Sequence, residues 1–354
     1  SSSASGTAPA GLTVVLALVG VGTVSRGGGK LLVYESDARA RDPGARFQVN
    51  LIVTRRRGAL YTPHGLDLPR ALAAIQAGSL DGYGEAQLDE DALAVLREGD
   101  YDVLVENTPT NLDDGGPAMA HLQAALGRGK HAVTANKGPI VLALRQLEAL
   151  AKAHNAHLLY EGTVLSGTPI LSLHRYGLGG CAVTGVKGIL NGTTNYILSQ
   201  MEAGMGYDEA LAQAQQLGYA EADPSADVDG WDALAKVVIL ANAVMGADLT
   251  VDDVAREGIS GITAKDVQDA LAQGKRWKLI GQARREGEAV RASVKPTQIP
   301  LSDPLAGVGA AMNALTFETD VLKSVTITGA GAGGPQTGFA ILSDLLELAR
   351  RLRI

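Results

Sequence analysis

Apolar residues in the first half of the chain fall into short unbroken runs separated by polar or glycine-rich turns. The run at residues 12–19 contains no charged residue and is apolar apart from Thr13, as a parallel strand buried on both faces requires, and it leads directly into glycines. The pattern predicts further strands at residues 47–53, 101–105, 131–135 and 158–160, with helices at 117–126 and 141–154. Strands that alternate with helices predict an α/β fold, with a Rossmann-type, doubly wound nucleotide-binding domain at residues 11–155.

The second half of the chain alternates less regularly. Helices are predicted at residues 196–203, 207–217 and 231–245, and strands at 182–190 and in a region that ends near residue 300. This mixture predicts an α+β domain at residues 156–324 that binds the substrate. The final strand, SVTIT, runs into glycines and then a helix at 337–353, which repeats the strand–loop–helix pattern of the N-terminus. We therefore expect residues 325–354 to return to the nucleotide-binding domain and complete it.

Composition narrows the class of protein. The 354 residues are 46% hydrophobic and 19% charged, which is typical of a folded globular chain. The net charge of −7 comes without a basic stripe and argues against a nucleic-acid partner. No segment reaches the roughly 18 apolar residues of a membrane helix, and no basic region of a secretory signal is present, so we expect a cytoplasmic location and no membrane partner. The single cysteine, Cys181, excludes a disulfide framework and is expected to be a buried, inert thiol.

Glycines follow the first strand in a pattern close to the dinucleotide fingerprint. Gly20, Gly22 and Ser25 give G-x-G-x-x-S, in which the two glycines permit a tight turn and a close approach to a pyrophosphate. Ser25 is small enough to replace the third glycine, whose task is close packing of helix on strand. The residues predicted to hold the cofactor phosphates are Gly20, Gly22, Thr23 and Val24.

Other loops at the ends of predicted strands add candidate cofactor contacts. The strand at 47–53 is followed by TRRR, where NAD-preferring sites place an acid, and Arg55 and Arg56 would instead pair with a 2′-phosphate. This favours NADP over NAD; the alternative is a solvated basic turn. Thr108 lies in the loop after the strand at 101–105, and Lys137 lies in a loop predicted at 136–139, so both are expected to face the cofactor.

The stretch GYAEADPSADVDGWDALAK, residues 218–236, carries the densest candidate chemistry. Asp232 and Lys236 stand four residues apart where a helical apolar pattern begins, which places both side chains on one helix face. A lysine beside several carboxylates is a candidate proton donor, and the carboxylates are candidate partners for a substrate ammonium or hydroxyl group. The alternative interpretation is an acidic, solvated loop with a surface salt bridge.

Histidine is the competing acid–base residue, and its positions argue against that role. None of the six histidines sits in a recognisable motif. We expect each to be a surface or structural residue; they are His64, His121, His131, His154, His157 and His174.

Six fragments in one order resemble homoserine dehydrogenases. They are GVGTV, TANKGP, GTVLSGTPI, GILNGTTNYIL, the 218–236 stretch and GAGAGG, and together they span the chain from residue 11 to its end. The resemblance implies reduction of L-aspartate 4-semialdehyde to L-homoserine with a nicotinamide cofactor, on the route to threonine, methionine and isoleucine. It also implies a homodimer, in which the sheet of the second domain faces a partner subunit. Since the chain stops directly after its last helix, we expect no C-terminal regulatory domain and no threonine feedback through one.

The resemblance also implies roles for single residues. Lys236 matches the lysine that donates a proton to the carbonyl oxygen, and Lys137 matches a second active-site lysine beside nicotinamide and substrate. Glu221 and Asp232 match the residues that hold the amino and hydroxyl ends of the substrate. The further matched positions are Gly218, Glu221 and Gly333 for the cofactor, and Glu161 with the carbonyls of Val164, Ser166 and Thr168 for a sodium ion.

Two other functions are open at the level of sequence. One is a nicotinamide-dependent reductase of another semialdehyde or keto acid, since one fold serves many substrates; the presence of Glu221, Asp232 and Lys236 argues against it. The other is a cofactor-binding sensor without activity, against which both lysines argue.

Overall fold

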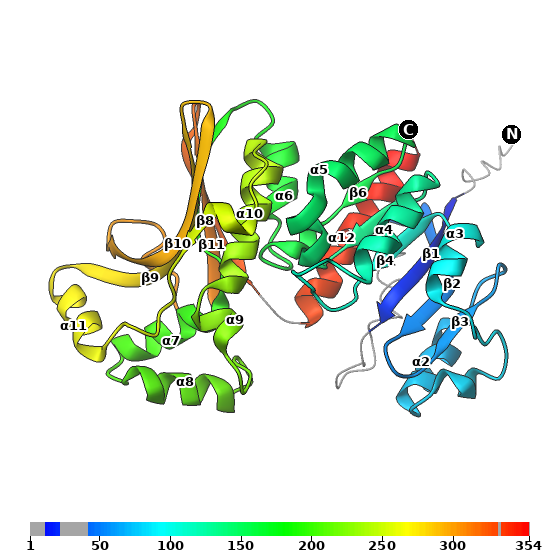
Figure 1. Cartoon of the computed structure of the whole chain (residues 1–354), viewed down its shortest axis with the longest axis horizontal. Helices are drawn as coiled ribbons and strands as arrows, with labels where there is room; N and C mark the ends of the chain where they lie inside the picture. The colour runs from blue at the N-terminus through cyan, green and yellow to red at the C-terminus, as the bar shows by residue number, and fades with distance from the viewer. Residues whose placement is uncertain (1–10, 22–41, 332–333, 354) are drawn as a thin grey trace, which may run out of the picture.

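The computed structural model describes residues 11–21, 42–331 and 334–353 (Figure 1). The first domain is built on a six-stranded sheet with the order β3-β2-β1-β4-β5-β6. All neighbouring strands run parallel except β3, which is antiparallel to β2. The strands are β1 (Leu12–Val21), β2 (Ala45–Thr54), β3 (Ala59–Tyr61), β4 (Val103–Glu106), β5 (His131–Thr134) and β6 (Leu158–Leu159).

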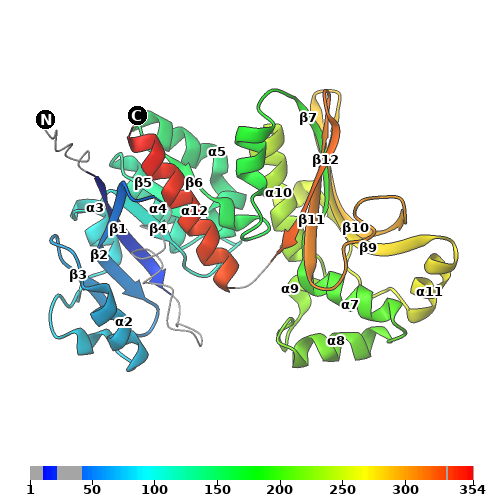
Figure 2. The same cartoon turned by 180° about the vertical axis from the view of Figure 1, so that it is seen from behind.

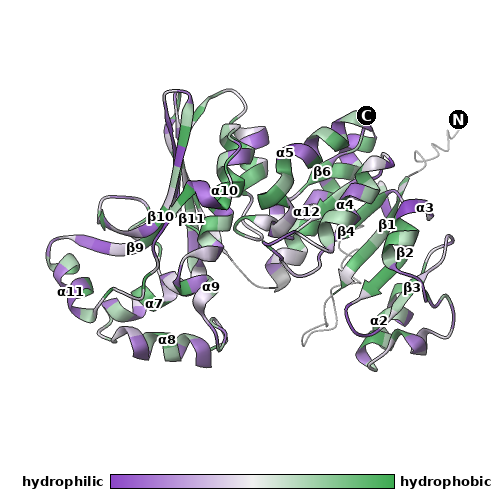
Figure 3. Ribbon diagram, viewed as in Figure 1, coloured by the Kyte–Doolittle hydropathy of each residue, from purple (hydrophilic) through white to green (hydrophobic). Residues whose placement is uncertain are grey.

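Helices cover both faces of this sheet, so the doubly wound domain is confirmed. Helices α3 (Ala92–Glu98), α4 (Ala118–Gly127) and α5 (Lys137–Ala153) share one hydrophobic core with one face of the strands. Helices α2 (Leu68–Gln76) and α12 (Gly334–Leu352) share a second core with the other face. Because both faces are buried, β1 and β4 consist almost wholly of apolar residues, which is the pattern that predicted them (Figure 3).

The second domain contains another six-stranded sheet, with the order β12-β11-β7-β9-β10-β8. Its neighbouring strands are antiparallel except for the β10–β8 pair. The strands are β7 (Val183–Ile189), β8 (Val254–Arg256), β9 (Lys275–Glu286), β10 (Ala289–Pro300), β11 (Met312–Thr319) and β12 (Lys323–Ala330). The helices are α7 (Gly192–Glu202), α8 (Tyr207–Gln216), α9 (Ser225–Val228), α10 (Trp231–Met245) and α11 (Ala264–Ala272).

Short helical segments join the two domains. They are η2 (Glu161–Thr163), α6 (Ile170–Ser172) and η3 (Leu173–Gly177), between β6 and β7, whereas η1 (Leu80–Tyr83) lies within the first domain and η4 (Val251–Asp253) within the second. Helix α10 packs on the second sheet and also contacts α5 of the first domain, so it spans the junction of the two domains (Figure 1).

The last strand does not lie where the sequence analysis expects it. The SVTIT strand, β12, pairs with β11 in the second sheet, and only α12 crosses back to the first domain (Figure 2). The expectation that residues 325–330 complete the nucleotide-binding domain is therefore wrong. Strand β11 was not predicted, because the expected strand-rich region ended near residue 300. It is joined to β12 by a short turn, and the two strands pair as an antiparallel hairpin.

No helix in the described part of the chain combines the length and the apolar character that a bilayer-spanning segment needs.

Candidate active site

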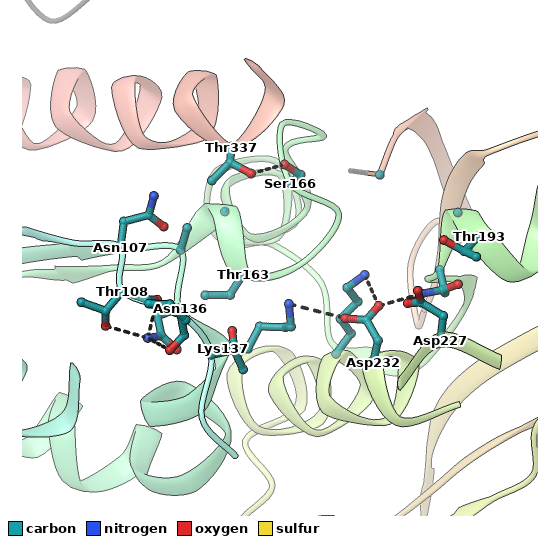
Figure 4. Close-up of a pocket in the computed structure, with 18 of the residues that line it drawn as sticks. Asn107, Thr108, Asn136, Lys137, Thr163, Ser166, Thr193, Asp227, Asp232 and Thr337 are labelled. Atoms are coloured by element: carbon teal, nitrogen blue, oxygen red, sulfur yellow. Dashed lines mark hydrogen bonds and ion pairs between the residues drawn. The ribbon is translucent and has the colours of Figure 1, made fainter. Parts of the chain in front are cut away.

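A cavity of about 490 Å³ lies at the junction of the two domains. The loops that follow β4 and β5 form one wall, and the beginnings of α7 and α10 form the other. The first wall is the carboxyl end of a parallel sheet, where ligands of doubly wound folds bind. Polar side chains from both domains point toward one another in this cavity (Figure 4).

Two lysines share one carboxylate in the cavity. Lys236 Nζ lies 2.7 Å from Asp232 Oδ2, and Lys137 Nζ lies 3.4 Å from Asp232 Oδ1. Burial would raise the pKa of the Asp232 carboxyl, but the ammonium groups of Lys236 and Lys137 outweigh it and hold that pKa well below its usual value. The cluster therefore carries two positive charges and one negative charge, beside a cavity that a small polar molecule can enter.

Helix α10 buries Lys236 because the surrounding helix positions are apolar. Residues 233–241 are all buried, and Lys236 is the only charged residue among them. A buried ammonium group is costly unless it is paired and hydrogen-bonded. Here Asp232 supplies the charge, and the backbone carbonyl of Leu190 accepts a hydrogen bond of 2.7 Å from Nζ. The pair is thus part of the cavity wall, and the alternative interpretation as a surface salt bridge is wrong.

Helix α5 begins at Lys137, so the loop predicted at residues 136–139 is wrong. Asn136 has extended backbone angles and its side chain accepts the N–H of Gly138, which makes it the N-cap of the helix. Pro139 is tolerated because it stands in the first turn, where the missing N–H has no helical partner. The helix start fixes the backbone of Lys137 and directs its ammonium group toward Asp232 (Figure 4).

Asn191 and Asp227 extend the cluster, and the sequence analysis did not assign them a role. Asn191 caps α7 and donates hydrogen bonds to Asp227 Oδ1 at 2.7 Å and to Asp232 Oδ2 at 3.0 Å. Burial raises the pKa of Asp227, and the nearby negative charge of Asp232 adds to this effect. The sequence shows an asparagine before a predicted helix and several acids further along the chain. The contacts of Asn191 with Asp227 and Asp232 depend on tertiary structure.

Glu221 and Gly218 lie at the edge of this site. The Glu221 side chain is exposed and does not line the cavity, although its charge contributes to the raised pKa of Asp227. Gly218 has a φ of +80° and ends α8. Between them, Tyr219 does line the cavity, and its carbonyl accepts a hydrogen bond of 2.6 Å from the hydroxyl of Thr193.

Of the described cofactor candidates, Thr108 and Lys137 line the cavity, whereas Gly20, Arg55 and Arg56 lie outside its lining. Gly20 has a φ of +87°, and a Cβ added there would lie 2.5 Å from the backbone of Asn107 and Thr108. Only glycine fits this approach of β1 to the loop after β4, as a dinucleotide site requires. Arg55 and Arg56 are exposed just after β2, whereas the neighbouring Arg57 donates to the carbonyl of Ile75. Gly22, Thr23, Val24 and Gly333 lie outside the described residues.

The predicted sodium ligands gather where the chain crosses between domains. Both carboxylate oxygens of Glu161 accept backbone N–H groups, from Leu171 at 2.9 Å and from Ser172 at 3.1 Å. The carbonyl of Thr168 accepts the N–H of Ile170. No group of three or more His, Cys, Asp or Glu side chains suited to a metal occurs among the described residues. Three of the four predicted ligands are backbone carbonyls, however, so the absence of such a side-chain group among the described residues does not test the sodium site, which stays a prediction.

Two family models match the chain, one to each domain. The model described as homoserine dehydrogenase, NAD binding domain, matches residues 20–161, and the model described as homoserine dehydrogenase matches residues 169–346. The chain belongs to the homoserine dehydrogenase family.

Full-length relatives agree with this assignment. An NAD⁺-dependent homoserine dehydrogenase of Pseudomonas canavaninivorans is 42% identical over 94% of this chain and 95% of its own length. The crystal structure of a homoserine dehydrogenase from Thiobacillus denitrificans is 33% identical, with a TM-score of 0.80 over 97% of this chain and 74% of that chain. A hyperthermophilic archaeal homoserine dehydrogenase mutant in complex with NADPH is 29% identical, with a TM-score of 0.81 over 96% and 98%.

Membership in the homoserine dehydrogenase family confirms the predicted class of enzyme, an oxidoreductase with a nicotinamide cofactor and a small-molecule substrate. It argues against both alternatives, the inactive sensor and the reductase of another semialdehyde or keto acid. The roles of individual residues and the choice between NAD and NADP stay predictions.

Proposed function

We propose that this homoserine dehydrogenase reduces L-aspartate 4-semialdehyde to L-homoserine with Lys236 as the proton donor. The observation that carries the proposal is the Lys236–Asp232–Lys137 cluster, because it places a buried ammonium group in the wall of the cavity. Bound reduced nicotinamide supplies a hydride to the aldehyde carbon, which leaves negative charge on the aldehyde oxygen. Lys236 stabilises that charge and transfers one proton to it, directly or through a water molecule.

Asp232 and Asn191 orient Lys236 for this transfer. With Asp232 Oδ2 and the Leu190 carbonyl accepting two of its hydrogen bonds, the ammonium group keeps a third N–H for the substrate oxygen. Lys137, on the opposite side of the same carboxylate, adds positive charge near the developing oxyanion. We assign the substrate ammonium group to Asp227, which lines the cavity, with the charge of Glu221 at the edge of the site assisting it.

The substrate carboxylate requires donors, and two places in the cavity offer them. Lys137 with the backbone of Gly162 and Thr163 is one of them, but the N–H of Thr163 already donates to the Tyr160 carbonyl at 3.1 Å. The first turn of α7, at Gly192 and Thr193, also lines the cavity and presents the positive end of a helix. We favour this turn together with Lys137.

NADPH is the cofactor that the residues after β2 favour. Arg55 and Arg56 are exposed there, and no acid stands among them to bind a ribose 2′-hydroxyl. The relatives support either choice, since one is named NAD⁺-dependent and another was solved with NADPH. A homodimer, a bound sodium ion and a cytoplasmic location complete the proposal.

The test follows oxidation of NADPH and of NADH with L-aspartate 4-semialdehyde, for the wild type and for Lys236→Met. Methionine keeps the buried stem but removes the proton, so we expect kcat to fall by about 10²-fold or more. Lys265→Met is the matched control, because Lys265 forms an i, i+4 pair with Asp269 at the same 2.7 Å but its side chain is 83% exposed. That variant should keep wild-type turnover.

Three results would contradict parts of the proposal. Turnover that survives in Lys236→Met would assign the proton to another donor, such as water near Lys137. A wild type that binds NADPH without turnover would refute the proposed reaction itself. A kcat/KM higher with NADH than with NADPH would assign Arg55 and Arg56 to a solvated turn.

A further inference from the structure

A buried carboxylate lies directly beneath the loop that lines the cofactor side of the cavity. Glu106 is the last residue of β4, and its side chain has no exposed surface. The loop that follows it, residues 107–110, forms part of the cavity wall. Burial of an ionisable carboxylate is costly, so its partners show what the fold uses it for.

Glu106 forms hydrogen bonds both with helix α4 and with this loop. One carboxylate oxygen lies 2.6 Å from Nδ1 of His121, a residue of α4 whose side chain is 9% exposed. The other oxygen accepts the backbone N–H of Thr108 at 2.7 Å, and it also accepts the Thr108 hydroxyl. His121 is the one ion-pair partner that the described part of the chain offers to Glu106.

The contacts continue from Thr108 to the start of α5 (Figure 4). The side-chain amide of Asn136 donates to the Thr108 carbonyl at 2.9 Å, and its oxygen accepts the N–H of Gly138 at 2.9 Å. The hydroxyl of Thr134 donates to the Glu106 carbonyl and accepts the N–H of Asn136 at 3.0 Å. Every link between His121 and the first turn of α5 is therefore a hydrogen bond made by a buried or partly buried group.

We infer that Glu106 and His121 are positioning residues of the reductase site, which act by fixing Thr108 and Asn136 and, through them, Lys137. The inference rests on the proposed function of Lys137. A pair that only stabilised the core would need no contact beyond His121 and Glu106. Here one oxygen of the carboxylate is committed to the loop, and that loop is bound to the N-cap of the helix that carries Lys137.

The experiment separates positioning from general stabilisation with a double-mutant cycle. His121→Leu removes the donor to Glu106, and His121→Asn retains a donor close to the place of Nδ1. We expect kcat/KM to fall at least tenfold in His121→Leu and to stay within threefold of the wild type in His121→Asn. In a Lys137→Ala background, His121→Leu should cause less than a twofold further loss, because the residue through which it acts is gone.

The inference would be overturned if His121→Leu lowered kcat/KM by the same factor in the Lys137→Ala background as in the wild type. Thr108→Val serves as a second variant if His121→Leu does not fold. It removes the hydroxyl bond to Glu106 and the 3.3 Å contact from the Asn136 amide to that hydroxyl, and it should show the same dependence on Lys137. An equal loss with and without Lys137 would again overturn the inference. Turnover by the wild type in the same assay reports on the proposed function separately.

Discussion

At the scale of single residues, the site depends on buried charged groups that are stable only because each has partners of opposite charge or hydrogen-bond acceptors. Asp232 stays ionised because two ammonium groups flank it, and Lys236 stays buried because a carboxylate and a carbonyl accept its hydrogen bonds. Lys278 shows the opposite case, a buried lysine without a carboxylate within 4 Å of its ammonium group among the described residues. Its Nζ donates to the Val308 carbonyl at 2.7 Å and to Asn195 Oδ1 at 3.0 Å, and burial lowers its pKa to about 8.

This lowered pKa predicts a pH dependence of stability. Between about pH 8 and the unperturbed lysine pKa of about 10.4, the unfolded chain binds a proton at Lys278 that the folded chain does not. The contribution of Lys278 to the free energy of unfolding therefore rises with pH through this window. We therefore expect the free energy of unfolding in urea of Lys278→Met, relative to that of the wild type, to be higher at pH 7 than at pH 9.5. The exposed Lys295→Met should show no such change, and a constant difference for Lys278→Met would contradict the prediction.

At the scale of elements, two helix starts build the site. Asn136 caps α5 and Asn191 caps α7, and each asparagine also binds a residue of the cavity wall. Both positions were expected in loops, because apolar periodicity begins only after the first turn of each helix. An N-cap reports where a helix starts, but its tertiary contacts decide whether it also serves a site.

The double task of Asn136 can be tested against a cap of the same kind elsewhere. Asn136→Ala should cost at least about 1 kcal/mol of stability, a usual value for a lost N-cap, and should lower kcat at least tenfold because Lys137 loses its fixed backbone. Thr263→Ala removes the capping box of α11, far from the cavity, and should cost a similar stability with unchanged kcat. Equal kcat values for the two variants, measured at a temperature where both are folded, would refute the role of Asn136.

At the scale of the whole molecule, the second sheet has unequal faces. Helices α7, α10 and α11 pack on one face. On the other face, one row of polar residues crosses five paired strands: Thr326, Thr316, Lys187, Gln282 and Ser293. Part of this face is covered by residues 305–308, which form a small core with Ile189, Ile280 and Ile299. The rest is the surface on which we place the proposed partner subunit.

The proposed homodimer predicts a mass of twice the 36.5 kDa of the chain in sedimentation equilibrium. Gln282→Arg puts a bulky charge in the middle of the polar row, beside Lys187, and should shift the protein to monomers at micromolar concentration. Gln76→Arg makes the same change at an exposed position of α2 and should leave the dimer intact. A dimer that persists in Gln282→Arg would move the interface to another surface.

The sequence by itself determined the features that depend on neighbours along the chain. Short, mostly apolar runs predicted β1 and β4, since a strand covered on both faces admits few polar residues. The four-residue spacing of Asp232 and Lys236 predicted their contact, since it is a property of the helix alone. The order of the matched fragments pointed to the family.

Tertiary structure decided which distant segments meet. The sequence pattern of a strand followed by glycines is the same in either domain, so the pattern does not show to which sheet β12 belongs. Its pairing with β11 assigns it to the second sheet. Lys137 joins Asp232, Asp227 joins Asn191, and His121 joins Glu106, because the packing of α5, α7, α9 and α4 brings these side chains within hydrogen-bonding distance or close to it. Apolar periodicity records which face of an element is buried but not what covers it, and so these contacts could not be read from the sequence.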